Sequence, residues 1–208
     1  GTSVKFWPDP KFFDTINVAK SRLKHLLRAK AVLCPGISIE FKDEVDSRNN
    51  ECWKFMDGLG DYLSSELASV DCILESPFIG HIVQEHQQAD WAITWATGAG
   101  ENMTESYVNL IPTTQGGSHV SGFRSGITEA MREFCEHRSL LPRGVRITHE
   151  DVWLFCSFVI SIRMKDPQFS GQTKDRLSAR EAATFVATVT KDAFILWLNQ
   201  NTEEGEKI

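Results

Sequence analysis

The apolar stretch from Val152 to Met164 most constrains the fold, because its composition favours a buried β-strand. A helical pattern begins soon afterwards, near Ser178. Pro167 lies between the two and, having no backbone N–H group, predicts the end of the strand. Gly171 predicts a backbone turn that a side chain would hinder. A strand, a loop and a helix are therefore expected in this order.

The loop carries three neighbouring polar side chains, Gln172, Thr173 and Lys174. An amide, a hydroxyl and an ammonium group together suit an anionic oxygen ligand such as a phosphate. The sequence is not a Walker phosphate loop, so an ordinary solvated loop stays open as the alternative on physical chemistry alone.

The rest of the chain predicts an α+β protein. Strands are expected over 37–41, 52–56, 77–83, 89–97 and 105–111, and a short strand over 4–8. Helices are expected over 15–34 and 59–67, and a further helix is expected to begin near 118. On the strand 89–97, Trp91, Ile93 and Trp95 share one face by their period of two and are expected in the core.

Several polar residues predict helix starts and turns. Capping boxes are expected at Thr148 and Ser178, and side-chain caps at Asp57 and at Ser118 or Ser121. Residues 98–100 predict a hairpin turn. The last long helix is expected to bury Phe185, Val189 and Leu196, and residues 202–207 are expected to fray.

Composition excludes several classes of protein. The chain has 208 residues and a net charge of −6, which argues against a surface coated with nucleic-acid-binding residues. Five widely spaced cysteines without a CxxC motif predict neither a zinc site nor a disulfide framework, and favour a reduced, cytoplasmic protein. No apolar run is long enough to span a membrane. No metal site is predicted, because His81, Glu85 and His86 match no zinc-binding spacing.

Two basic clusters stand out against this acidic background. Lys20, Lys24 and Arg28 follow one helix face, where they would meet DNA, an acidic neighbour or only solvent. Arg143 and Arg146 form the second cluster, which either lines a DNA-facing cavity through phosphate contacts or is an ordinary loop.

Five stretches, spread over nearly the whole chain, resemble a known family. Residues 166–177, DPQFSGQTKDRL, resemble the QTK loop of type II DNA topoisomerase ATPase subunits, and residues 107–124, YVNLIPTTQGGSHVSGFR, resemble the strand and GGTH-type helix start of the same family. Ser118 stands where the family has Thr. Residues 1–9 resemble the last part of a GHKL ATPase fold. Residues 134–145 and 191–201 are more similar to the topoisomerase IV B branch than to gyrase B.

The resemblance implies two domains and a nucleotide site. Residues 1–57 would be the C-terminal part of a GHKL ATPase domain, and residues 58–208 a transducer domain with a ribosomal protein S5 domain 2-like fold and a left-handed βαβ crossover. Lys174 and Gln172 would reach the γ-phosphate of ATP, and Thr2 would lie near the adenine. The chain is expected to be a fragment: the magnesium ligands and the general base would lie upstream, and no catalytic residue is expected within it.

The implied activity is ATP-driven DNA strand passage, with decatenation and relaxation. The implied partners are DNA, the A subunit of topoisomerase IV and a second B subunit within an A2B2 complex, without a membrane. Gyrase B and a non-enzymatic S5-like module that binds nucleic acid or protein are the alternatives. The binding module is distinguished from the other two by the loop residues Gln172, Thr173 and Lys174, which a plain binding module does not need.

Overall fold

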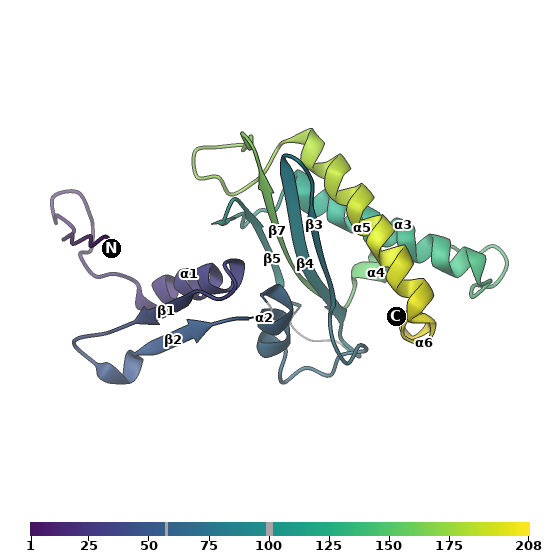
Figure 1. Ribbon diagram of the computed structural model, residues 1–208, viewed down its shortest axis with the longest axis horizontal. Helices are drawn as coiled ribbons and strands as arrows, with labels where there is room; N and C mark the ends of the chain where they lie inside the picture. Colours follow the sequence, from purple (N-terminus) through teal and green to yellow (C-terminus); the bar gives the residue numbers. More distant parts are fainter. Residues whose placement is uncertain (57, 99–101) are drawn as a thin grey trace. The chain divides into compact units, whose positions relative to one another are not determined.

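The computed structural model describes residues 1–56, 58–98 and 102–208 (Figure 1). Asp57 and residues 99–101 lie outside the described residues, and with them two of the three residues of the hairpin turn predicted over 98–100. The chain divides into two compact units, Gly1–Met56 and Asp57–Ile208.

The first unit pairs one helix with a β-hairpin. Helix α1 (Lys20–Leu33) packs against β1 (Ser38–Phe41) and β2 (Glu51–Lys54), which pair antiparallel and are joined through the short 3-10 helix η1 (Ser47–Asn49). The helix begins five residues later than predicted, because residues 15–18 are β-branched residues and Asn, which favour helices weakly. The predicted strand over 4–8 is wrong. Residues 1–9 pair with no other strand in the described part of the chain, and an isolated strand is not stable.

The basic helix face of this unit contacts acidic side chains of the same unit. Lys20 Nζ donates a hydrogen bond to Asp43 Oδ2 at 2.6 Å, and Lys24 Nζ donates one to Glu51 Oε1 at 2.5 Å. The hydrogen bonds from Lys20 and Asn49 hold the pKa of the Asp43 carboxyl well below its usual range. The hairpin is therefore the acidic neighbour of these two lysines.

The second unit is built on one mixed sheet in the order β3-β4-β7-β5-β6. Its strands are β3 (Phe78–Val83), β4 (Gln87–Trp95), β5 (Thr104–Val108), β6 (Ile111–Pro112) and β7 (Cys156–Met164). Strand β7 is antiparallel to β4 and parallel to β5. The connection from β5 to β7 passes through α3 (Ser118–His137) and α4 (His149–Trp153). The left-handed sense of this crossover stays a prediction.

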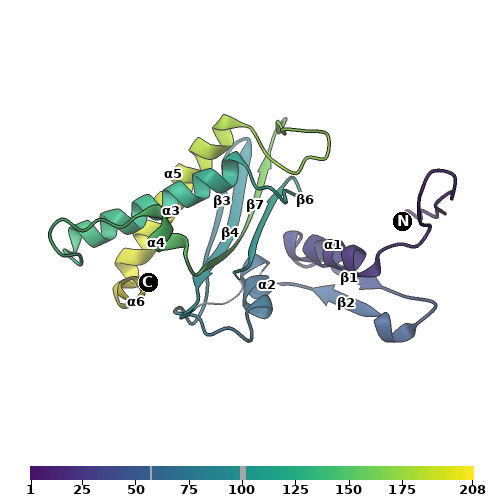
Figure 2. The same ribbon diagram turned by 180° about the vertical axis from the view of Figure 1, so that it is seen from behind.

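Helices α3 and α5 (Arg180–Gln200) lie side by side along one face of the sheet, and α2 (Leu59–Glu66) contacts β3, β4 and β7 (Figures 1 and 2). Trp91 and Trp95 are buried, as predicted, because they face the two long helices. The Trp95 ring stacks on Phe194 of α5, and the Trp91 ring contacts Phe123 of α3. This aromatic layer forms the core between the sheet and the helices.

Two glycines let α3 approach α5 closely. A Cβ atom on Gly122 would lie 2.3 Å from the Ala183 carbonyl oxygen, and one on Gly126 would lie 2.4 Å from Thr190 Oγ1. No side chain fits at either distance. The spacing of four residues places both glycines on the same helix face, against the backbone of α5.

The predicted helix caps have mixed outcomes. The capping box at Thr148 is confirmed, because its Oγ1 accepts from the Asp151 N–H and an Asp151 carboxylate oxygen accepts from the Thr148 N–H. The capping box at Ser178 is wrong: the N-cap of α5 is Ala179, and the Ser178 hydroxyl donates to the Gln168 carbonyl instead. The side-chain cap at Ser118 or Ser121 is also wrong, since Gly117 is the N-cap of α3.

The C-terminal helices differ from the prediction in two respects. Leu196 is 60% exposed, whereas Phe194 and Leu198, two residues before and after it, are buried. Residues two apart lie on nearly opposite faces of a helix, so the face that packs on the sheet contains Phe194 and Leu198 and not Leu196. Residues 202–207 form a short helix, α6 (Thr202–Lys207), rather than a frayed tail. Gly205 anchors it against Phe134, where an added Cβ would lie 3.0 Å from the ring.

Candidate functional site

The loop between β7 and α5 is closed by its own backbone hydrogen bonds. The Ser170 N–H donates to the Arg176 carbonyl at 2.9 Å, and the Ser178 N–H donates to the Gln168 carbonyl at 2.8 Å. An isolated β-bridge joins Phe169 to Leu177 between these bonds. The two arms of the loop therefore run antiparallel, and the loop ends in a tight turn.

The turn consists of residues 171–174 and presents the three polar side chains to solvent. The Lys174 N–H donates to the Gly171 carbonyl at 3.2 Å, and Gln172, Thr173 and Lys174 are all exposed. The left-handed backbone falls on Lys174, with φ of 61°, and not on Gly171, so the predicted role of Gly171 is wrong. The Lys174 ammonium lies 5.9 Å from the centre of the Phe169 ring, within range of a cation–π contact.

The C-terminal arm of the loop is fastened to the segment before α3. The Gln115 N–H donates to the Asp175 carbonyl at 2.9 Å, the Leu177 N–H to the Gly116 carbonyl at 3.1 Å, and the Ser118 N–H to the Leu177 carbonyl at 3.0 Å. Gly117 has φ of 130°, and a Cβ atom there would lie 2.2 Å from the Leu177 carbonyl oxygen. Only glycine allows this approach, so Gly117 holds the loop in place.

The first turn of α3 buries an imidazole beside this anchor. His119 is fully buried, and its Nε2 lies 3.3 Å from the Thr113 hydroxyl. Burial lowers the pKa of His119 to about 4, so the ring is neutral at pH 7. It acts here as a packed, hydrogen-bonded residue of the helix start.

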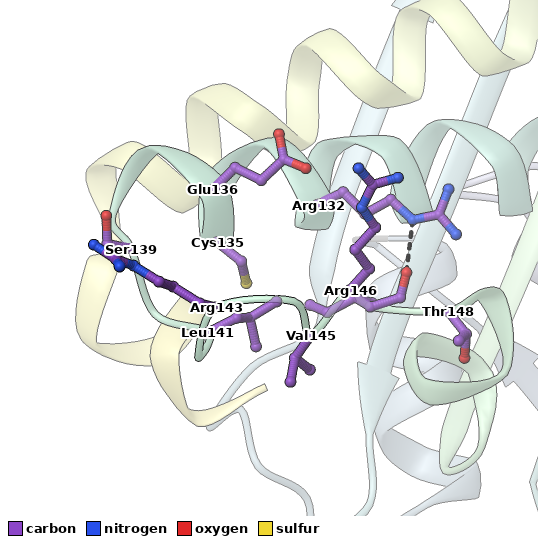
Figure 3. A pocket seen from close by; sticks show the side chains of 10 residues that line it. Arg132, Cys135, Glu136, Ser139, Leu141, Arg143, Val145, Arg146 and Thr148 are labelled. Atoms are coloured by element: carbon purple, nitrogen blue, oxygen red, sulfur yellow. Dashed lines mark hydrogen bonds between the residues drawn. The ribbon is translucent and has the colours of Figure 1, made fainter.

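A separate cavity of about 680 Å³ lies beneath the end of α3 and contains both arginines of the second basic cluster. Figure 3 shows the guanidinium groups of Arg132 and Arg146 on one side of this arginine cavity and that of Arg143 beside Ser139. The Arg132 Nε–H donates to the Ile147 carbonyl at 2.8 Å, and its terminal nitrogens have no hydrogen-bond partner among the described residues. Within the described ranges, none of the three arginines forms an ion pair. An anion is therefore the ligand that the cavity favours.

Comparison with known proteins assigns the family. The family model for DNA gyrase B matches residues 58–208 of the chain. The chain belongs to the DNA gyrase B family. The predicted resemblance and the α+β fold class are both confirmed.

Several relatives are similar over nearly the whole chain. The B subunits of DNA topoisomerase 4 from Escherichia coli (strain K12) and Pseudomonas aeruginosa (PAO1) are each 55% identical, over 99% of this chain and 32% of their own length. The topoisomerase IV ATP-binding domain of Francisella tularensis, solved with a small-molecule inhibitor, is 38% identical with a TM-score of 0.81, over 97% of this chain and 54% of that one. The chain thus spans about a third of the length of these curated relatives.

A more distant structure shows the same fold. The 43K ATPase domain of Thermus thermophilus gyrase B, solved with an aminocoumarin, has a TM-score of 0.81 at 24% identity, over 96% of this chain and 53% of that one. The DNA gyrase B fold therefore tolerates extensive sequence change.

The predicted nucleotide residues of this family member are divided between the two units. Gln172 and Lys174 share the turn at the end of the loop, whereas Thr2 lies in the first unit, exposed in the segment before α1. Arg143 and Arg146 share the arginine cavity. Their binding roles stay predictions.

Sequence reasoning missed two groups that the fold assembles. Arg132 carries no signal in the sequence, but its place on α3 lets it complete the arginine cavity. Glu105 accepts hydrogen bonds from the Tyr62 and Tyr107 hydroxyls, and burial together with the Glu105 charge raises the pKa of Tyr107 well above its usual range. The Glu105–Tyr107 spacing of two along a strand was a signal for one half of this network.

The described residues contain neither a metal cluster nor a membrane-spanning helix. Over residues 1–56, 58–98 and 102–208, no group of three or more His, Cys, Asp and Glu side chains is placed to hold a metal ion. All five cysteines are free. In the described portion of the chain, every helix is too short or too polar to cross a membrane.

Proposed function

We propose that the chain is part of a topoisomerase IV-type B subunit and that its QTK loop senses the γ-phosphate of ATP. Lys174 supplies a cation and Gln172 an amide to the terminal phosphate, as the resemblance implies. The observation that carries the proposal is the anchored turn, which exposes both side chains while Gly117 fixes the loop behind them. Exposed donors on a fixed backbone fit an anionic oxygen ligand.

The loop residues bind and orient, and the hydrolysis itself belongs to residues elsewhere in the subunit. ATP with magnesium supplies the phosphoryl chemistry when bound. Because ADP has no γ-phosphate, Lys174 and Gln172 contact only one of the two nucleotide states. A ligand that makes different contacts in two arrangements shifts the balance between them, which would couple hydrolysis to DNA strand passage.

Replacing Lys174 in the full-length subunit tests this role. Lys174→Ala removes a cation aimed at developing charge, so we expect a loss of about 2–4 kcal/mol of transition-state stabilisation, or roughly 30- to 1,000-fold in ATPase rate. ADP affinity and melting temperature should stay nearly unchanged, because the side chain is exposed. Lys174→Arg should rescue activity only in part, since a planar fork does not replace a compact ammonium.

Lys165→Ala is the matched control, because Lys165 is another exposed lysine between β7 and the turn. It should leave the ATPase rate unchanged. Normal ATP hydrolysis by the Lys174→Ala subunit would show that the γ-phosphate role is wrong. Loss of ADP affinity and melting temperature together with activity would show that Lys174 is structural.

The arginine cavity supports a second role, contact with the DNA backbone through Arg143 and Arg146. This role is supported by the three arginines that line one cavity in a chain with a net charge of −6. Within the described ranges, none of the three forms an ion pair. Arg143→Gln and Arg146→Gln should each weaken DNA binding for all sequences and reduce its salt dependence. Unchanged salt dependence in both variants would exclude the contact.

The remaining features of the proposed subunit follow from the resemblance. Residues 1–57 form the end of a GHKL ATPase domain, and residues 58–208 form a transducer domain. The subunit works in the cytoplasm on DNA, as a B-subunit dimer with two A subunits. Decatenation by the full-length subunit with its A partner supports topoisomerase IV, whereas ATP-dependent negative supercoiling would identify gyrase B instead.

A further inference from the structure

A second polar cavity, of about 370 Å³, lies between β5, the start of α3 and the C-terminal arm of the QTK loop. It is separate from the arginine cavity and does not include the turn with Gln172 and Lys174. We call it the Arg124 cavity. Its lining includes Arg124, Arg176, Thr104, Gln115 and Glu105.

Arg124 is a partly buried cation without a charged partner among the described residues. Its guanidinium carbon lies 5.3 Å from the centre of the Trp153 ring and 5.7 Å from that of Phe158. Its Nε is buried and, among the residues that the structure describes, donates no hydrogen bond. A buried charge is costly unless it is paired and hydrogen-bonded, so this position favours an anion.

The carboxylate of Glu105 does not fill this role, although Glu105 lines the cavity. Side chains alternate along β5, so Glu105 and Tyr107 point to one face while Thr104 and Ser106 point to the other. The Glu105 carboxylate accepts from the hydroxyls of Tyr62 and Tyr107 on its own face. Arg124 contacts Phe158, which pairs with Thr104 and therefore lies on the opposite face.

Arg176 brings a second guanidinium to the same cavity, from the loop. Its side chain is exposed, while its carbonyl accepts from the Ser170 N–H and so belongs to the closed part of the loop. The Gln115 amide and the Thr104 hydroxyl add neutral donors to the lining. Arginine forks match the oxygens of a phosphate better than any other side chain.

We propose that the Arg124 cavity binds a phosphate group carried by a small molecule, held between Arg124 on α3 and Arg176 on the QTK loop. The bound group would tie the C-terminal arm of the loop to the helix. The site is distinct from the γ-phosphate contact of Lys174. It therefore stands or fails independently of the proposed function, and it can be tested without ATP.

The test is calorimetric titration of inorganic phosphate into the chain and its variants, at constant ionic strength. We expect saturable binding of one phosphate per chain, and a loss of affinity of at least about tenfold in Arg124→Gln and in Arg176→Gln. Arg180→Gln is the matched control, because Arg180 is exposed at the start of α5 and lies outside the cavity lining. It should bind phosphate like the parent chain.

Hydrogen exchange provides a readout of the proposed link. Phosphate should slow exchange of the Ser170 and Leu177 amides in the parent chain and not in Arg176→Gln. Since Arg124 also packs on two rings, its variant can lose structure, but Arg176 is exposed and its variant keeps the test valid.

Three outcomes would overturn the proposal. They are the absence of saturable binding, equal binding by all variants, and a loss of phosphate binding in Arg180→Gln as large as in Arg176→Gln. A fourth result, in which both cavity variants weaken binding of duplex DNA while inorganic phosphate never saturates, would assign the cavity to the nucleic acid backbone instead.

Discussion

Acid should destabilise this protein through one buried imidazole, that of His119. The ring is fully buried in the first turn of α3, with Nε2 beside the Thr113 hydroxyl and Nδ1 without a partner in the part of the chain that the structure covers. Burial lowers its pKa from 6.5 to about 4, because the charged ring would have to leave water.

The sign of the effect follows from proton binding. Between pH 6.5 and pH 4 the unfolded chain protonates this histidine and the folded chain does not, so stability falls as the pH falls through this window. The gap between the two pKa values corresponds to about 3 kcal/mol, and about 2.5 kcal/mol of it should be lost by pH 4.5. Above pH 6.5 the contribution is fully present.

Urea unfolding of the parent chain and of His119→Gln between pH 7.5 and pH 4.5 measures this contribution. The variant should be less stable at pH 7.5, and the difference between the two proteins should shrink by about 2.5 kcal/mol at pH 4.5. His137→Gln, at an exposed histidine of the same helix, should keep the parental pH dependence. Parallel pH profiles for the parent chain and His119→Gln would refute the assignment.

Three further predictions concern packing and activity. Gly126→Ala should lower the free energy of unfolding by about 1–3 kcal/mol, because its Cβ would meet Thr190 Oγ1 at 2.4 Å. Ser125→Ala, at the exposed neighbouring position, should leave the free energy of unfolding nearly unchanged, and the midpoints of urea unfolding measure both effects. Gly117→Ala in the full-length subunit should reduce the ATPase rate. Gly171→Ala should leave the rate unchanged, since nothing lies within 4 Å of a Cβ atom on Gly171. Equal ATPase rates in the two variants would contradict the anchoring role of Gly117. The 208-residue chain alone should not hydrolyse ATP, and magnesium-dependent turnover that co-purifies with it through several columns would disprove this.

The elements with strong local signals were predictable from the sequence. The capping box at Thr148 depends on two residues three apart, and the burial of Trp91 and Trp95 depends on a strand period that a sheet enforces. The failures have a common physical cause, which is competition from contacts distant in sequence. Ser178 offers a good cap to α5, yet its hydroxyl bonds the Gln168 carbonyl across the closed loop.

The strand predicted over residues 4–8 failed for a related reason. Alternating apolar residues indicate a strand only where a neighbouring strand supplies hydrogen bonds, and the described residues offer none to this segment. The site residues also divide into those that the sequence predicts and those that only the fold brings together. Gln172 and Lys174 were found because they are close together in sequence, whereas Arg132 joins Arg143 and Arg146 only through the fold.

The placement of the QTK loop and the acid sensitivity of the protein have a shared structural origin in residues 113–119. Gly116 and Gly117 hold Leu177 of the loop, and two residues later His119 is buried beside Thr113. Protonation of His119 in the folded state would require the first turn of α3 to open, and this turn begins at Ser118, whose N–H donates to Leu177. Opening the helix start therefore also releases the loop. We accordingly expect the amide of Leu177 to lose hydrogen-exchange protection at the same pH at which His119 becomes protonated.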